Sequence, residues 1–241
     1  RAESGGRGSR RAADGNDATG AARQEPRPPG QLDVAALIKQ LDSDSYHQRV
    51  AAQLELEHRG AEAVRAVKAA VEAKQLGPHG RLHGVWIMAR SGSDTALEDL
   101  FAIARSDTDP RVRAQAIRAI GDLTDPVLTE KRIEADRGDA RVGVRIAGLA
   151  RQDTDPRVVL ESLIVLRRLR WQHTPEWMVK NVAPDDPALN HAAVQALRHA
   201  DNWPAVAGLL DVQPQFRRLA LRAMAEQRVE FLADELIRRI E

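Results

Sequence analysis

The sequence predicts an all-α fold, namely a right-handed α-solenoid of about six two-helix repeats. The hexapeptide at 107–112, Asp-Thr-Asp-Pro-Arg-Val, returns unchanged at 153–158. Each copy is followed by apolar or small residues spaced three and four apart, which places their side chains on one face of a helix. Aromatic residues make up only 3% of the chain, and no stretch alternates apolar and polar residues for long enough to form a strand.

The hexapeptide predicts the start of a helix. Its second Asp, Asp109 or Asp155, can accept hydrogen bonds from the free N–H groups of a first helical turn. Pro at the first helical position loses nothing, because its missing N–H would have no partner there. The residue three after each Asp, Val112 or Val158, begins the apolar face, so we expect both to be buried. The remaining members of the two faces are Ala116, Ile117 and Ile120, and Ser162, Leu163 and Leu166.

Weaker copies of this helix start occur at Asp186, at Gln213 and at Ser43, and the first two are followed by Pro. The interval from Asp155 to Asp186 is 31 residues, which fits one two-helix unit. The interval from Asp109 to Asp155 is 46 residues, so we expect an insertion between those units. The faces predicted from the weaker copies are Leu189, Ala193, Val194 and Leu197; Phe216, Ala220, Leu221 and Met224; and Tyr46, Val50, Ala51 and Leu54.

Apolar spacing, together with breaks at Gly60 and Gly77, divides the rest of the chain into helices. One further unit must lie between 43 and 109, and Leu82, Val85, Trp86 and Ala89 are assigned to its second helix. The expected helices are 32–41, 45–59, 61–75, 79–90, 94–105, 109–121, 139–151, 155–169, 174–182, 186–199, 203–210, 214–227 and about 229 to the end, with the insertion at 124–138.

Residues 1–30 form a segment of different composition, with no Leu, Ile, Val or aromatic residue. Such a segment cannot bury enough apolar area to offset the entropy lost on ordering. We therefore expect a disordered linker at 1–30 and the solenoid at 31–241. A basic arm for nucleic acid is the alternative, but the acidic residues Glu3, Asp14, Asp17 and Glu25 dilute its Arg residues.

Composition excludes several classes of protein. Lys and Arg number 36 and Asp and Glu 35, so the net charge of +1 argues against nucleic acid or an anionic membrane as the partner. The absence of Cys excludes disulfides, thiolate metal sites, cysteine nucleophiles and a covalently attached c-type haem. No apolar run approaches the roughly 18 residues that span a bilayer, so we expect no membrane insertion.

Candidate reactive groups have simpler structural interpretations. His79 and His83 stand four apart, as paired metal ligands do, but no third ligand accompanies them. The adjacent carboxylates Asp185 and Asp186 are explained better by a helix cap before Pro187 than by catalysis. There is no Gly-rich phosphate loop and no nucleophile turn. We expect no catalytic, cofactor or metal site.

Arginines next to a tryptophan form the candidate interaction surface. Basic side chains beside an aromatic ring could hold phosphate or stack on a base, although Arg also lies over packed helices for structural reasons. We favour a protein-contact surface or a solvated face over nucleic-acid binding. The surface consists of Arg167, Arg168, Arg170 and Trp171, with a second group at Arg217, Arg218 and Arg222.

The helix start Asp109, Val112 and Arg113, followed inward by Ala116 and Ile120, resembles HEAT repeats, which have an armadillo-type fold. The resemblance covers about 32–241 and extends to the short HEAT-like repeats of phycobilisome-lyase-type proteins. It implies a HEAT-like solenoid and nothing specific about function.

Segments 153–161, 169–171, 196–198 and 202–206 are similar to the HEAT segment of planctomycete-type membrane-bound dehydrogenases. Those proteins resemble sugar dehydrogenases with a β-propeller before this segment and often a cytochrome domain after it. This chain has neither the propeller nor a haem-attachment motif, so no redox role passes to any residue here. The resemblance implies at most the scaffold segment of such an oxidoreductase, in the periplasm or cell envelope; otherwise we expect a cytoplasmic protein.

Architecture therefore predicts a non-catalytic scaffold for protein–protein interaction or domain spacing. Its partner would be another protein or the adjacent domains of a larger chain. The scaffold segment of a propeller-type dehydrogenase and a DNA-binding HEAT-like module are the alternatives.

Overall fold

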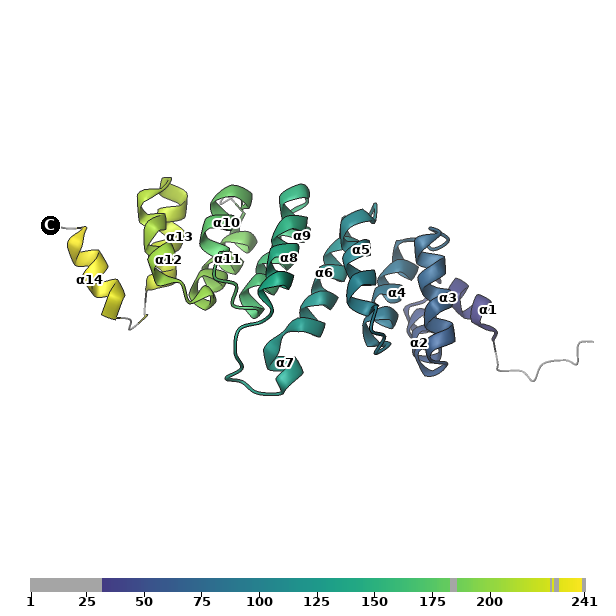
Figure 1. Cartoon of the computed structure of the whole chain (residues 1–241). Coiled ribbons are helices and arrows are strands. Elements are labelled where there is room, and N and C mark those ends of the chain that lie inside the picture. Colours follow the sequence, from purple (N-terminus) through teal and green to yellow (C-terminus); the bar gives the residue numbers. More distant parts are fainter. Residues whose placement is uncertain (1–31, 183–185, 226, 228–229, 240–241) are drawn as a thin grey trace, which may run out of the picture. The chain divides into compact units, whose positions relative to one another are not determined.

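The computed structural model describes residues 32–182, 186–225, 227 and 230–239. Every regular element in these ranges is a helix, and none of them is a strand, which confirms the all-α prediction. The linker predicted at 1–30 lies outside the described residues and stays a prediction, and so does the expected domain boundary. Figure 1 shows the helices in chain order.

Twelve of the described helices form six consecutive pairs, the number of units that the sequence predicts. In the first five pairs the two helices pack against each other, and in the sixth the 3₁₀ turn that follows α12 packs on α13. The pairs are α1 (Val34–Gln40) with α2 (Tyr46–His58), α3 (Ala61–Glu72) with α4 (Pro78–Arg90), α5 (Ala96–Ser106) with α6 (Pro110–Thr124), α8 (Ala140–Gln152) with α9 (Pro156–Arg168), α10 (Thr174–Asn181) with α11 (Pro187–Ala200), and α12 (Trp203–Gly208), extended by a 3₁₀ turn (Leu209–Asp211), with α13 (Pro214–Met224).

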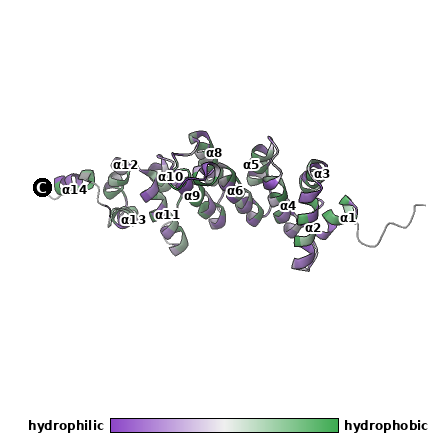
Figure 2. Ribbon diagram, turned by 90° about the horizontal axis from the view of Figure 1, so that it is seen from below, coloured by the Kyte–Doolittle hydropathy of each residue, from purple (hydrophilic) through white to green (hydrophobic). Residues whose placement is uncertain are grey.

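The pairs stack so that first helices and second helices form two rows. The second helices α2, α4, α6, α9, α11 and α13 each pack on the next one in the series, and these contacts are more extensive than those between first helices. In Figure 2 the first helix of each pair lies above its second helix. We call the two sets the first-helix row and the second-helix row. Hydrophobic and hydrophilic residues alternate along the helices in the same figure, as amphipathic sequences require.

The core lies between the two rows and contains the faces predicted after the hexapeptides. Val112 and Val158 are both 0% exposed, so the expectation of burial is confirmed. Ser162 occupies a core position as a polar residue, and its hydroxyl donates a 2.8 Å hydrogen bond to the carbonyl oxygen of Val158. That bond removes the cost of burying an unpaired hydroxyl.

The face predicted from Ser43 is wrong by two residues. Ser45, not Ser43, caps α2, and the Ser43 hydroxyl instead accepts a 3.1 Å hydrogen bond from the Ser45 N–H. Tyr46 and Leu54, predicted as core, are 63% and 55% exposed. The buried residues of α2 are Ala52, Gln53 and Leu56. In α13 the predicted Leu221 is likewise 47% exposed, and Leu219 lies in the core.

The register of α2 counted from Ser45 predicts opposite effects on stability for substitutions at two leucines of this helix. Leu56 is 0% exposed, so Leu56→Ala should lower the free energy of unfolding by about 3 kcal/mol through lost burial and a residual cavity. Leu54→Ala, on the exposed side of α2, should change it by less than about 0.5 kcal/mol. Urea denaturation of the two variants measures both changes in the free energy of unfolding. Equal changes would mean that the register counted from Ser43 is the correct one.

The predicted insertion between units holds the short helix α7 (Pro126–Glu130), which lies apart from the pairs in Figure 1. Asp125 caps α7 by accepting a 2.8 Å hydrogen bond from the Val127 N–H. The segment returns to the stack at Gly138, whose N–H donates to the Leu169 carbonyl at 3.0 Å. Between these points the segment is mostly exposed, and Ile133 is 88% exposed.

Helix α14 (Glu230–Arg238) follows the sixth pair, and its Leu232 is buried. Among the described helices, none is both long and apolar enough to cross a membrane.

Candidate functional site

Two arginines bind the aspartate that opens the next helix start along the chain. Arg113 donates to both carboxylate oxygens of Asp153, at 2.6 and 3.1 Å, and Arg81 does the same to Asp107, at 2.8 and 3.2 Å. Each aspartate also accepts a hydrogen bond from the backbone N–H two residues later. The sequence alone predicts no role for this first Asp of the hexapeptide, although its presence in both copies is a signal.

These pairs stabilise the stack and are not free to bind a partner. The side chains of Arg81 and Arg113 are only 11% and 17% exposed. Each also donates to a backbone carbonyl of its own unit, from Leu76 or Asp107, so each guanidinium joins two units. Bidentate Arg–carboxylate pairs of this kind fix geometry as well as adding energy.

In the predicted group around Trp171, two residues contact other segments of the chain and two lie half-buried at the surface. Arg168 binds Asp122 at 2.7 Å and Asp125 at 2.8 Å, with its side chain 15% exposed. A methyl group added at Gly143 would overlap the Trp171 ring, so the ring fills the space over that glycine. Arg168 and Trp171 therefore hold the junction between units, whereas Arg167 and Arg170 are half-buried at the surface.

The second predicted group lies on α13 and is exposed. Arg217 donates a 2.7 Å hydrogen bond to the Leu210 carbonyl, which ties it to the preceding turn. Arg218 and Arg222 form no ion pair with any residue that the structure describes. Whether the two predicted groups contact a partner stays a prediction.

Charge is distributed unequally between the two rows. The six second helices carry thirteen Arg, no Lys and only four acidic residues, whereas the paired first helices carry eight basic and five acidic residues. The four acids of the second helices are Glu55, Glu57, Asp122 and Glu161. The net charge of +1 does not reveal this unequal distribution of charge between the two rows.

Four exposed arginines share the outward side of the second-helix row. Arg118 and Arg222 both stand nine residues after the residue that caps their helix, Arg218 stands five after and Arg157 two after. At about 100° per residue these positions fall within roughly 60° of one another and opposite the core face. We call Arg118, Arg157, Arg218 and Arg222 the arginine surface.

The same outward side is apolar on α2 and α4. Leu54 and Trp86 occupy the position nine residues after the cap, which is that of Arg118 in α6. Tyr46 is exposed at the first position of α2, eight residues before Leu54, and Trp86 is half-buried with the Arg90 guanidinium 6.0 Å from the centroid of its ring. A 2.6 Å hydrogen bond between Gln53 and His83 joins the two helices. We call Tyr46, Leu54 and Trp86 the apolar patch.

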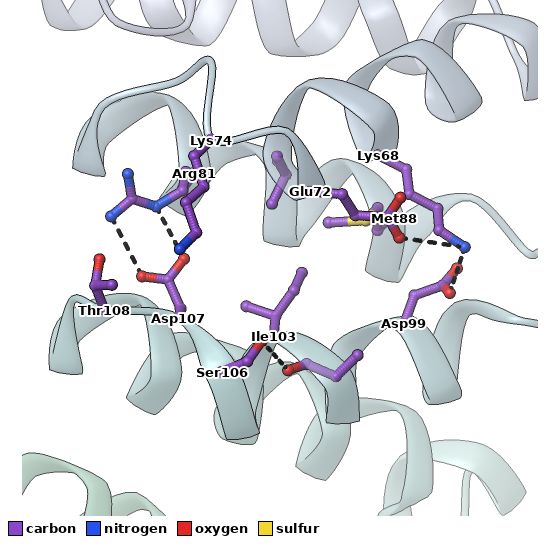
Figure 3. Close-up of a pocket in the computed structure, with 12 residues that line it drawn as sticks. Lys68, Glu72, Lys74, Arg81, Met88, Asp99, Ile103, Ser106, Asp107 and Thr108 are labelled. Atoms are coloured by element: carbon purple, nitrogen blue, oxygen red, sulfur yellow. Dashed lines mark hydrogen bonds and ion pairs between the residues drawn. The ribbon is translucent and has the colours of Figure 1, made fainter.

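A groove between α3, α4 and α5 is a further concave feature, drawn in Figure 3. It encloses about 90 Å³ over an apolar floor that includes Met88 and Ile103. Lys68 and Asp99 point toward each other across it at 2.6 Å. This hydrogen bond raises the pKa of Lys68, so its amine stays protonated and cannot act as a nucleophile at neutral pH.

The candidate reactive groups of the sequence have structural partners. The Asp186 carboxylate accepts hydrogen bonds from the Ala188 and Leu189 N–H groups at 2.7 and 3.3 Å, which confirms the helix cap; Asp185 lies outside the described residues. Burial lowers the pKa of His83, which bonds Gln53. In the described ranges, no group of three or more His, Cys, Asp or Glu side chains is placed to hold a metal ion.

Comparison with known families identifies the repeat. Residues 34–121 and 77–141 match the family described as HEAT repeats. These two segments, which together span 34–141, are similar to HEAT repeats. The same pairing continues through α13, so the fold is an all-α, HEAT-like solenoid. Among solved structures, the chain is similar to the crystal structure of an engineered protein, with 17% identity over 80% of this chain and 98% of that chain and a TM-score of 0.39.

No curated protein matches the chain. The narrower resemblances, to phycobilisome-lyase-type repeats and to the planctomycete-type dehydrogenases, therefore stay predictions.

Proposed function

We propose that the chain is a non-catalytic scaffold that binds a protein partner on the outward side of its second-helix row. The observation that carries the proposal is the apolar patch. Tyr46 and Leu54 are 63% and 55% exposed and lie outside the core of their own unit. Exposed apolar side chains grouped with an aromatic ring are typical of protein-binding surfaces, where Tyr and Trp contribute most of the binding energy.

The HEAT repeats support this proposal, because stacked helix pairs present one aligned row of side chains from many units. The contacts that hold the helices together support the proposal as well. The apolar core and the buried arginines Arg81 and Arg113 account for the stability of the stack, and neither involves Tyr46 or Leu54.

The proposal is tested by replacing exposed side chains of the apolar patch and measuring whether the chain still captures its protein partners. Tyr46→Ser with Leu54→Ser should leave the fold intact, because both side chains are exposed. Affinity capture by the purified chain, quantified by mass spectrometry, should show specific partners lost by at least about tenfold in this variant.

The matched control is Val144→Ser with Leu128→Ser, two side chains that are 60% and 52% exposed on α8 and α7. It removes similar apolar area away from the second-helix row and should retain the partners. If both variants capture the same proteins as the wild type, the patch binds nothing, and domain spacing becomes the better reading.

A further inference from the structure

We propose that the arginine surface binds an acidic segment of a protein partner, in which Asp or Glu residues are interspersed with apolar ones. The inference rests on the proposed function, because it assigns the partner chemistry for the same second-helix row. Its basis is the contrast between arginines that the chain pairs internally and arginines that it leaves exposed on that row.

The internal pairs show what the exposed arginines lack. Arg81, Arg113 and Arg168 are each held by Asp carboxylates of another segment at 2.6 to 2.8 Å. In the described part of the chain, Arg118, Arg218 and Arg222 take part in no such pair, and Arg157 reaches only Asp155, at 3.5 Å. The arginine surface thus offers guanidinium groups to carboxylates from outside.

The choice of side chain favours carboxylate recognition. Every fixed cation of the second helices is Arg, and none is Lys. Arg presents a planar fork of donors that fits a carboxylate bidentately, whereas Lys offers a flexible point charge.

The arginine surface lies on α6, α9 and α13; α6 packs on α9, α9 on α11 and α11 on α13. Packed helices lie about 8–10 Å apart, so three steps cover roughly 24–30 Å. An extended chain rises about 3.3 Å per residue, so a bound segment of roughly eight or nine residues would reach from Arg118 to Arg218.

Side chains between the arginines favour a polypeptide over nucleic acid. Leu160 and Ile164 lie five and nine residues after Asp155 on α9, both half-buried on the outward side. Apolar side chains of an acidic peptide can cover Leu160 and Ile164, which a sugar–phosphate backbone cannot do.

The test uses defined probes and the full chain. A fluorescein-labelled peptide repeating Asp-Glu-Leu-Ser should bind in fluorescence anisotropy, and a peptide with Asn and Gln in place of the acids should not. Raising the salt from about 50 mM to about 300 mM should weaken the acidic peptide by at least about tenfold, because exposed charges are screened. The triple variant Arg118→Gln, Arg157→Gln, Arg218→Gln should weaken it by about tenfold or more at low salt.

The matched control is Arg105→Gln, Arg151→Gln, Lys180→Gln, which removes the same charge from exposed positions of the first-helix row. It should bind the acidic peptide within about twofold of the wild type, and circular dichroism should show both triple variants folded. Equal weakening in the two triples, or equal binding of the neutral peptide, overturns the inference. Tighter binding of a DNA duplex or single strand than of the acidic peptide would make nucleic acid the partner instead.

Rejection of the acidic partner can be distinguished from rejection of the proposed scaffold function. If partners depend on Tyr46 and Leu54 in affinity capture while the acidic peptide fails to bind, the scaffold role stands and the acidic partner is rejected.

Discussion

Val112→Asp is expected to lower the free energy of unfolding by about 4 kcal/mol or more, one of the largest effects of any single substitution in this chain. Val112 is 0% exposed and lies between the two rows among apolar neighbours. A carboxylate there would lose its water without gaining a donor, and a buried unpaired charge is among the most costly groups in a protein. The same argument applies to Val158, which holds the equivalent position in α9.

The matched control for this prediction is Val144→Asp on α8. Val144 is 60% exposed, so the same chemical change should cost less than about 0.5 kcal/mol. Urea denaturation followed by circular dichroism measures both variants at neutral pH. Because each repeat contacts only its neighbours, the loss in Val112→Asp should appear first as unfolding of α5, α6 and the adjoining helices. A denaturation midpoint equal to that of the wild type would show that the apolar columns are not the core.

The fold could be predicted where the helix start is chemically unambiguous. Asp before Pro predicts a helix start, and the helices that begin after Asp109, Asp155 and Asp186 follow this prediction, with their buried faces. The same signal at Asp125 before Pro126, which caps α7, is not used in the prediction of the insertion. The face of α2 was not predicted correctly, because that helix is apolar on two sides and both Ser43 and Ser45 can precede a helix. What decides its register is contact with α4, where Gln53 meets His83, and local sequence cannot show such a contact.

The candidate site could be predicted only in part, because pairing depends on residues far apart in the sequence. Arg168 and Arg218 look alike in the sequence. Arg168, however, meets Asp122 and Asp125, more than 40 residues earlier, while Arg218 remains at the surface. The net charge of the whole chain does not show that the arginines are concentrated in the second-helix row, because it does not depend on which row each residue belongs to. The periodic signal was present, because Arg81 and Arg113 both stand four residues after a capping residue.

Asp153→Ala is expected to lower the free energy of unfolding by about 3–4 kcal/mol, because removing one partner of a buried ion pair leaves the other uncompensated. Asp153 is 13% exposed in its side chain and Arg113 17%, so solvent can replace little of the lost interaction. The substitution also removes the acceptor of the 3.0 Å hydrogen bond from the Asp155 N–H at the start of α9. Adding Arg113→Met should recover part of the loss, since an apolar chain then replaces the unpaired guanidinium.

The matched control is Asp139→Ala, which removes a 42% exposed carboxylate that pairs with the exposed Arg141 and caps α8. The cap and a solvent-exposed ion pair are lost, so stability should fall clearly less than in Asp153→Ala. The dependence of stability on pH gives a second test of the pair between Asp153 and Arg113. Burial alone raises the pKa of its carboxyl, but the hydrogen bonds from Arg113 and the Asp155 N–H and the charge of Arg113 outweigh burial and lower it below the ordinary 3.8. A lowered pKa means that the stabilisation is complete above pH 3.8 and disappears as the carboxylate is protonated at lower pH. The stability difference between Asp153→Ala and the wild type should therefore shrink in acid, and a difference that is small at pH 7 or constant down to pH 2 would contradict a stabilising pair.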